Sequence, residues 1–110
     1  MNQQIPSGDE LLKVLSALSN PQRLRIVAAL AQNRNYVSQL ARELGIGRPV
    51  LHMHLQRLEA AGLVSSALEL SQDGKAMKFF EVRAFDFRLT PEQITASAST
   101  ITVKNEGDRA

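Results

Sequence analysis

Apolar residues recur every three or four positions over most of the chain, which is the period of amphipathic helices. This pattern predicts helices over residues 9–18, 21–31, 37–44 and 48–61. Between residues 63 and 85 the pattern alternates loosely around SQDGK (71–75), whose Asp-Gly pair is a strong hairpin signal. A last helix is predicted to start at Pro91 and to run to about residue 103, although its threonines disfavour helix.

Residues suited to helix ends stand at the boundaries of these segments. Ser7 and Thr90 each precede a Glu or Gln by three positions, which is the spacing of a capping box. Asn20-Pro21 combines an N-cap residue with a proline in the first helical turn. Gly45 and Gly62 follow helices at positions where a left-handed backbone favours glycine.

The segment QLARELGIG (39–47) meets the demands of a helix-turn-helix. Ala41 is small enough to let two helices approach, Gly45 lets the chain reverse, and Ile46 can fill the corner. With the hairpin that follows, the order is α-α-α-α-β-β-α. We therefore expect a mainly α fold with a small β-hairpin, a winged helix-turn-helix, as one domain over residues 1–110. The helix-turn-helix would span 37–61 and the wing hairpin 63–85.

Two stretches, ALSNPQRLRIVAAL (17–30) and VSQLARELGIGRPVLHMHLQRLEAAGLV (37–64), together with the hairpin, resemble the ArsR family of transcriptional repressors. The resemblance implies a homodimer that binds operator DNA, with its first and last helices (9–18 and 91–103) at the dimer interface. The interface candidates are Leu11, Leu12, Leu15, Leu18 and Ile94. The alternative for the leucine stripe is that it only completes the monomer core.

The chain lacks the metal sites of the best-known members of that family. Those sites use cysteines near the third helix, where this chain has Tyr36-Val37-Ser38, or His and carboxylates on the last helix, where it offers only Glu92. His52 and His54 stand two apart on a helix and point about 160° from each other, so they cannot share a metal. We therefore predict no metal and no cofactor, and the effector remains open between a small molecule, a partner protein and none.

A helical projection of residues 48–61 separates a buried side from an outward side. Leu51, Leu55 and Leu58 define the buried stripe, with His54 at its edge and a ring nitrogen expected to bond to the backbone. On the outward side, Gln56 can pair with adenine, Arg48 with guanine or phosphate, and Met53 with a thymine methyl. The predicted DNA contacts are Arg48, Pro49, His52, Met53, Gln56 and Arg57, with Lys75 and Lys78 of the wing on phosphates.

Charge and composition exclude some classes of function but do not choose between the remaining ones. The net charge is +2, but residues 21–88 hold ten Arg or Lys against six Asp or Glu, a basic middle compatible with nucleic acid. The absence of cysteine excludes disulfides, thiolate metal sites and cysteine nucleophiles. No apolar run would span a membrane and no catalytic constellation is visible, so we expect a cytoplasmic protein that is not an enzyme. The competing interpretation is a winged-helix module for protein–protein interaction, because only Arg48 and Arg57 charge the recognition face.

Overall fold

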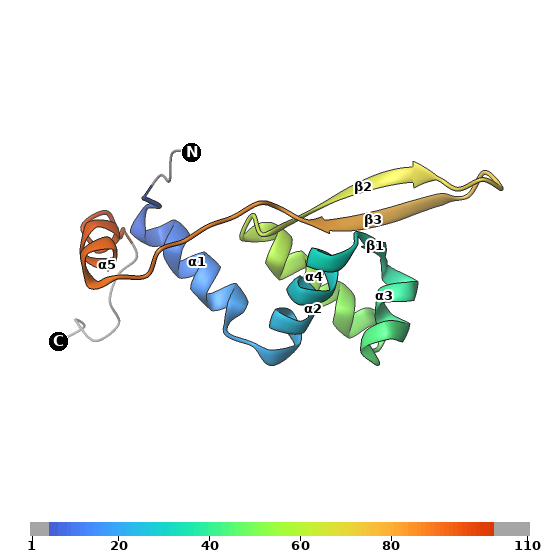
Figure 1. Ribbon diagram of the computed structural model, residues 1–110, viewed down its shortest axis with the longest axis horizontal. Helices are drawn as coiled ribbons and strands as arrows, with labels where there is room; N and C mark the ends of the chain where they lie inside the picture. Colours follow the sequence, from blue (N-terminus) through green and yellow to red (C-terminus); the bar gives the residue numbers. More distant parts are fainter. Residues whose placement is uncertain (1–4, 103–110) are drawn as a thin grey trace.

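Helices dominate the fold, and a long hairpin projects from one end of it (Figure 1). The computed structural model describes residues 5–102. Its elements are α1 (Gly8–Leu18), α2 (Pro21–Gln32), β1 (Asn35–Tyr36), α3 (Val37–Leu44), α4 (Arg48–Ala60), β2 (Val64–Leu70), β3 (Ala76–Val82) and α5 (Pro91–Ala98). This is the expected winged helix-turn-helix order with one added strand, β1. None of the helices described is long and apolar enough to cross a membrane.

The core lies between α2, α3, α4 and the base of the hairpin. Ile26 of α2, Leu40 of α3 and Leu55 of α4 are almost completely buried, and Phe80 of β3 closes the core from the sheet side. Each such side chain contributes about 1.5–3 kcal/mol through the apolar surface that it removes from water. This packing holds α4 firmly against the sheet.

The sheet is antiparallel with the strand order β1-β3-β2. Gly74, at the hairpin tip, has a φ of 83°, and Ser71 N–H donates to the Lys75 carbonyl oxygen (2.8 Å) to close the turn. The two-residue strand β1 pairs with β3 through Tyr36 and Phe79, whose rings meet edge to face at 5.6 Å. A strand of two residues leaves no periodic pattern, which is why the sequence did not predict it.

The predicted starts of α1, α2 and α5 are confirmed by their capping hydrogen bonds. Ser7 Oγ accepts from Glu10 N–H, and Thr90 Oγ1 accepts from Gln93 N–H, both at 3.1 Å. Asn20 Oδ1 accepts from two backbone N–H groups in the first turn of α2. These bonds satisfy donors that a helix N-terminus leaves without an intrahelical partner.

Three predictions about the elements were wrong in detail. The apolar spacing of residues 21–31 predicts that α2 turns Leu24, Val27, Ala28 and Leu30 inward. Leu30 is buried and Val27 packs against the core, but Leu24 is 55% exposed, Ala28 is exposed, and Ile26 is buried instead. The strand after the hairpin ends at Val82 rather than Phe85, because the chain leaves the sheet and runs towards α5. The last helix ends at Ala98 rather than near residue 103, which itself lies outside the described residues.

The early end of α5 follows from contacts with the start of α1. Thr100 Oγ1 accepts from Gly8 N–H (2.8 Å), and Ser97 Oγ donates to the Pro6 carbonyl oxygen (2.9 Å). Continuing the helix beyond Ala98 would take Thr100 away from Gly8. Ser99 Oγ and Thr100 Oγ1 also donate to the Ala96 and Ser97 carbonyl oxygens, and such local side-chain bonds compete with helix propagation.

The helices α1 and α5 form an arm at the end of the molecule opposite the hairpin tip (Figure 1). The molecule measures 57 × 38 × 20 Å, and its radius of gyration is 16.7 Å. A compact chain of this length would have a radius of gyration of about 13 Å. The arm therefore leaves more surface uncovered than a closed monomer would.

Candidate nucleic-acid interface

The helix-turn-helix is built as its sequence predicts. Gly45 ends α3 in the left-handed region, with a φ of 65°, and Ile46 N–H donates to the Ala41 carbonyl oxygen (3.1 Å). Ala41 and Ile46 are both buried in the corner between α3 and α4. A Cβ at Gly45 would be strained by its backbone angle rather than by crowding, since no atom lies within 4 Å of it. The turn thus sets the direction of the recognition helix α4.

Helix α4 has one buried and one exposed side. Leu51, Leu55 and Leu58 are completely buried, as the helical projection predicts. The outward residues Arg48, Pro49, His52, Met53, Gln56 and Arg57 are all exposed. His52 and Gln56 are linked on that face, with Gln56 Nε2 3.3 Å from His52 Nε2. The exposed side therefore offers donors, acceptors and one thioether to a partner.

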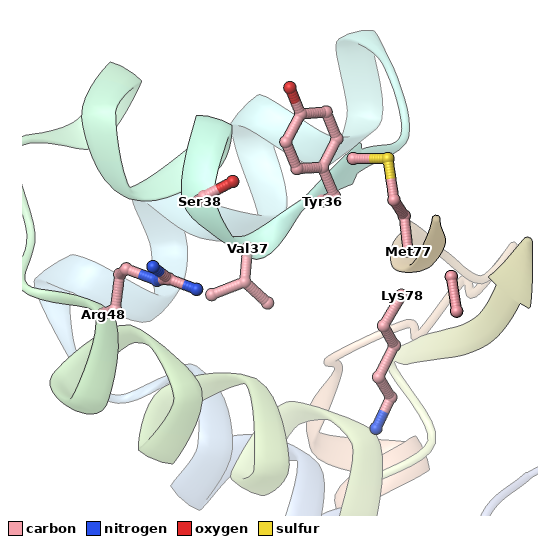
Figure 2. Close-up of a pocket in the computed structure, with 7 residues that line it drawn as sticks. Tyr36, Val37, Ser38, Arg48, Met77 and Lys78 are labelled. Atoms are coloured by element: carbon pink, nitrogen blue, oxygen red, sulfur yellow. The ribbon is translucent and has the colours of Figure 1, made fainter. Parts of the chain in front are cut away.

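A shallow pocket lies between the first turn of α4 and the hairpin (Figure 2). It has a volume of about 290 Å³ and is lined by residues of four elements, β1, α3, α4 and β3. Arg48 of α4 and Lys78 of β3 lie on two sides of it, with Val37 of α3 between them and Ser38 beside Val37. The structure thus brings together two cations that are thirty positions apart in the sequence and that the sequence predicted separately. We refer to this feature as the Arg48–Lys78 pocket.

The start of α3 adds to the positive character of the Arg48–Lys78 pocket. Tyr36 is the N-cap of α3 and makes no side-chain capping bond, so the first-turn N–H groups are not capped by it. A helix N-terminus carries a partial positive charge that favours an anion. The sequence did not predict that Tyr36 and Ser38 lie beside Arg48 and Lys78, because β1 and the fold of the hairpin bring them there.

The remaining predicted cations lie elsewhere. Lys75 is exposed at the hairpin tip and does not line the Arg48–Lys78 pocket. Beside it, the bond from Ser71 Oγ to the Asp73 carboxylate lowers the pKa of Asp73, which supports its turn role. Arg57 lines a different hollow, formed with α1 and α2. The recognition surface is therefore most basic at its α4 N-terminal end.

His54 is held by an arginine rather than by the backbone, so that part of the prediction was wrong. It is 6% exposed, and its Nδ1 lies 3.1 Å from an Nη of Arg23. A guanidinium only donates, so Nδ1 accepts and the neutral ring carries its proton on Nε2. Burial lowers the pKa of His54 below its ordinary value, and the charges of Arg23 and Arg57 lower it further.

The contact with His54 is one of those that fix the position of the Arg23 side chain. Its Nε donates to the Ala17 carbonyl oxygen of α1 (2.6 Å). One side chain thus connects the end of α1, the start of α2 and the buried side of α4. A cation at the C-terminal end of α1 also interacts favourably with the helix dipole.

The predicted dimer residues divide into two groups. Leu12, Leu15 and Ile94 are 45%, 39% and 49% exposed on the arm. Leu11 is buried and Leu18 packs against the core, so these two already have contacts within the chain.

Comparison with known proteins gives one family. The model described as "Bacterial regulatory protein, arsR family" matches residues 20–66. An uncharacterized HTH-type transcriptional regulator of Methanocaldococcus jannaschii is 36% identical over 85 residues, which cover 77% of this chain and 88% of that protein. The biofilm growth-associated repressor of Xylella fastidiosa is 33% identical over 65 residues, 59% of this chain and 57% of the repressor.

Solved structures share the fold. A homodimeric winged helix-turn-helix DNA-binding domain from Mycobacterium bovis, a possible ArsR-family regulator, superposes with a TM-score of 0.62 at 24% identity, covering 83% of this chain and 74% of that one. The crystal structure of NolR from Sinorhizobium fredii superposes with a TM-score of 0.60 at 23% identity, covering 90% of this chain and 92% of NolR.

Proposed function

The chain belongs to the arsR family of bacterial regulatory proteins, which are DNA-binding transcriptional regulators and not enzymes, and we propose that it is a repressor that binds a pseudo-palindromic operator as a homodimer. The observation that carries this proposal is the Arg48–Lys78 pocket beside the exposed side of α4. A recognition helix in the major groove needs cations at its start and on the wing to meet the phosphates that flank the groove.

In this proposal the residues of α4 and of the wing have different tasks. His52, Met53 and Gln56 contact base edges, where the amide of Gln56 suits adenine. Arg48 and Lys78 contact phosphates on either side of the pocket, and Lys75 contacts the backbone farther along the wing. The phosphate contacts supply affinity, and the α4 contacts supply sequence preference.

The arm supports the homodimer. Leu12, Leu15 and Ile94 expose apolar side chains at the end of the molecule opposite the wing. A second copy related by a two-fold axis would cover them and would set two recognition helices about one DNA turn apart. The related domain from Mycobacterium bovis is described as homodimeric, and the relative from Xylella fastidiosa as a repressor. We accordingly expect the protein in the cytoplasm, where bacterial and archaeal DNA lies.

The test is fluorescence anisotropy with the promoter DNA of the protein's own gene at several salt concentrations. Each phosphate contact contributes about 0.9 to the slope of log affinity against log salt, so Lys78→Gln in a dimer should reduce the slope by about 1.8. Arg88→Gln is the matched control, because Arg88 is exposed but lies outside the Arg48–Lys78 pocket.

Two results would contradict the proposal. If no DNA binds in a salt-sensitive manner, DNA recognition itself is wrong. If DNA binds but Arg48→Ala and Gln56→Ala leave the affinity unchanged, α4 is not the reading element, and the winged-helix module for protein–protein interaction becomes the better interpretation.

A further inference from the structure

A second hollow lies where α1, α2 and α4 meet, and no part of the proposed DNA interface other than Arg57 contributes to it. Its volume is about 640 Å³, within the range of about 300–1,000 Å³ typical of small-molecule sites. Its apolar lining includes Leu12, Ala17 and Ala60, and its cations are Lys13, Arg23 and Arg57. We refer to it as the three-helix pocket.

The charge of the three-helix pocket is unbalanced. Lys13 comes from α1, Arg23 from α2 and Arg57 from α4, so three separate helices each supply one cation. Among residues 5–102, none of the three forms a salt bridge. The acidic residue of the lining, Asp9, accepts a hydrogen bond from Thr102 N–H (3.0 Å) and another from the Thr102 hydroxyl. Three cations against this one carboxylate leave the lining positive, which favours an anionic occupant.

The three-helix pocket also has space and apolar surface for the body of a ligand. Ala17, Ala60 and Ala61 are small, and Leu12 remains 45% exposed beside them. A simple inorganic anion would leave this apolar surface in water, whereas an organic anion would cover it. Leu12 belongs both to this lining and to the proposed dimer surface, so the pocket opens beside that surface. A second copy that placed its own Lys13, Arg23 and Arg57 in the pocket would bring like charges together.

We propose that the three-helix pocket binds a small organic anion, with a carboxylate or similar group between Lys13, Arg23 and Arg57 and an apolar body against Leu12 and the alanines. Arg23 retains donors for such a ligand, because a guanidinium has five N–H bonds and its contacts with Ala17, His54 and Ser16 use three.

The pocket is connected to the DNA-reading helix by two of these cations. Arg57 is a residue of α4 itself, and Arg23 donates to His54 on the buried side of α4. An anion that draws Arg23 towards the pocket competes with the bond to His54 and changes how α4 is held. A ligand that binds the two arrangements unequally shifts the balance between them. This regulatory consequence rests on the proposed function, whereas the binding site does not.

The binding test is a titration of the full chain with octanoate, followed by NMR of the backbone amides and by calorimetry. We expect saturable binding with shifts in α1, the start of α2 and the end of α4. Octylammonium, which has the same apolar body and the opposite charge, should not bind there, and acetate should bind far more weakly. Lys13→Gln should weaken octanoate binding about tenfold or more, since it removes a charged hydrogen bond.

Two variants complete the design. Lys13→Arg retains the charge and should restore binding. Arg25→Gln removes an exposed α2 cation that does not line the three-helix pocket, so it should bind octanoate as the unmodified chain does. Circular dichroism checks that each variant is folded. The site is refuted if octanoate and octylammonium bind alike, if Lys13→Gln binds octanoate normally, or if octanoate binds only by dissociating a dimer.

DNA anisotropy separates this inference from the proposed function. Octanoate should change the DNA affinity of the unmodified chain and should not change that of Lys13→Gln. If octanoate binds but DNA does not, the proposed function fails and the pocket stands. If DNA binds but octanoate does not, the pocket fails and the proposed function stands. If both bind without affecting each other, the regulatory connection through Arg23 is refuted.

Discussion

Replacing Arg23 with methionine should loosen the junction of three helices at once. The Nε of Arg23 donates to the Ala17 carbonyl oxygen of α1 (2.6 Å), and one Nη donates to His54 Nδ1 of α4 (3.1 Å). Methionine keeps an unbranched apolar stem of similar reach but has no donor. The substitution therefore removes both bonds while changing the packing little.

The size of the effect follows from these contacts. A hydrogen bond from a charged group contributes about 1.5–3 kcal/mol, and a cation at a helix C-terminus contributes about 0.3–1 kcal/mol. Part of this gain offsets the cost of removing the guanidinium from water, so we expect a net loss of about 2–4 kcal/mol. That is a large fraction of the roughly 5–15 kcal/mol by which a small domain is stable.

Urea unfolding followed by circular dichroism measures this loss. At a slope of about 2 kcal/mol per molar urea, the midpoint should fall by about 1–2 M. The protein concentration must be the same for all variants, because a dimer is stabilised by its own concentration. Arg25→Met is the matched control. Arg25 is exposed and, within the part of the chain that the structure describes, its side chain bonds only to Gln22, at 3.5 Å. The free energy of unfolding should therefore change by less than about 0.5 kcal/mol.

A second measurement tests the same contact through His54. The charge of Arg23 is one of the causes that lower the pKa of His54, after burial. In Arg23→Met the pKa of His54, measured by NMR, should therefore rise towards its ordinary value while still remaining below it. If the unfolding free energy of Arg23→Met matches that of Arg25→Met and the pKa of His54 does not move, the connection between α1, α2 and α4 is not made by Arg23.

Three further predictions concern pH, the arm and the dimer. The pKa of His54 is lowered on folding, so the unfolded chain takes up its proton first as the pH falls. The free energy of unfolding should therefore decrease below about pH 6.5, by at most about 1.4 kcal/mol per pH unit. His54→Gln should abolish this part of the pH dependence, and an unchanged pH dependence would refute the prediction. Gly8→Ala would place a Cβ against Ile101 and the Ser97 carbonyl oxygen, so urea unfolding should show a loss of about 1–3 kcal/mol; no loss would mean that α5 is not seated on α1. Leu12→Asp together with Leu15→Asp should leave helix content unchanged and yield a monomer by sedimentation, whereas a persisting dimer would exclude the arm as its interface.

The features that were correctly predicted from the sequence depend on residues that are close together along the chain. A cap joins positions two or three apart, as Asn20 does with Gln22 and Arg23, and a helix face repeats every three or four residues, as Leu51, Leu55 and Leu58 do. Such local rules are sufficient to recognise the helix-turn-helix and the outward side of α4. They do not say which other elements face that side.

The features that only the tertiary structure decided join residues far apart in the chain. Arg48 and Lys78 line one pocket because α3 packs against both β3 and α4, and Arg23 reaches His54 because α2 packs against α4. The ends of the last helix and of β3 were mispredicted for the same reason, since contacts with Gly8 and the path towards α1 outweighed local preference. By itself the sequence determined which residues of α4 point outward. Packing decided which neighbours they have, so that Arg57 lines the three-helix pocket with Lys13 whereas Arg48 lines a pocket with Lys78.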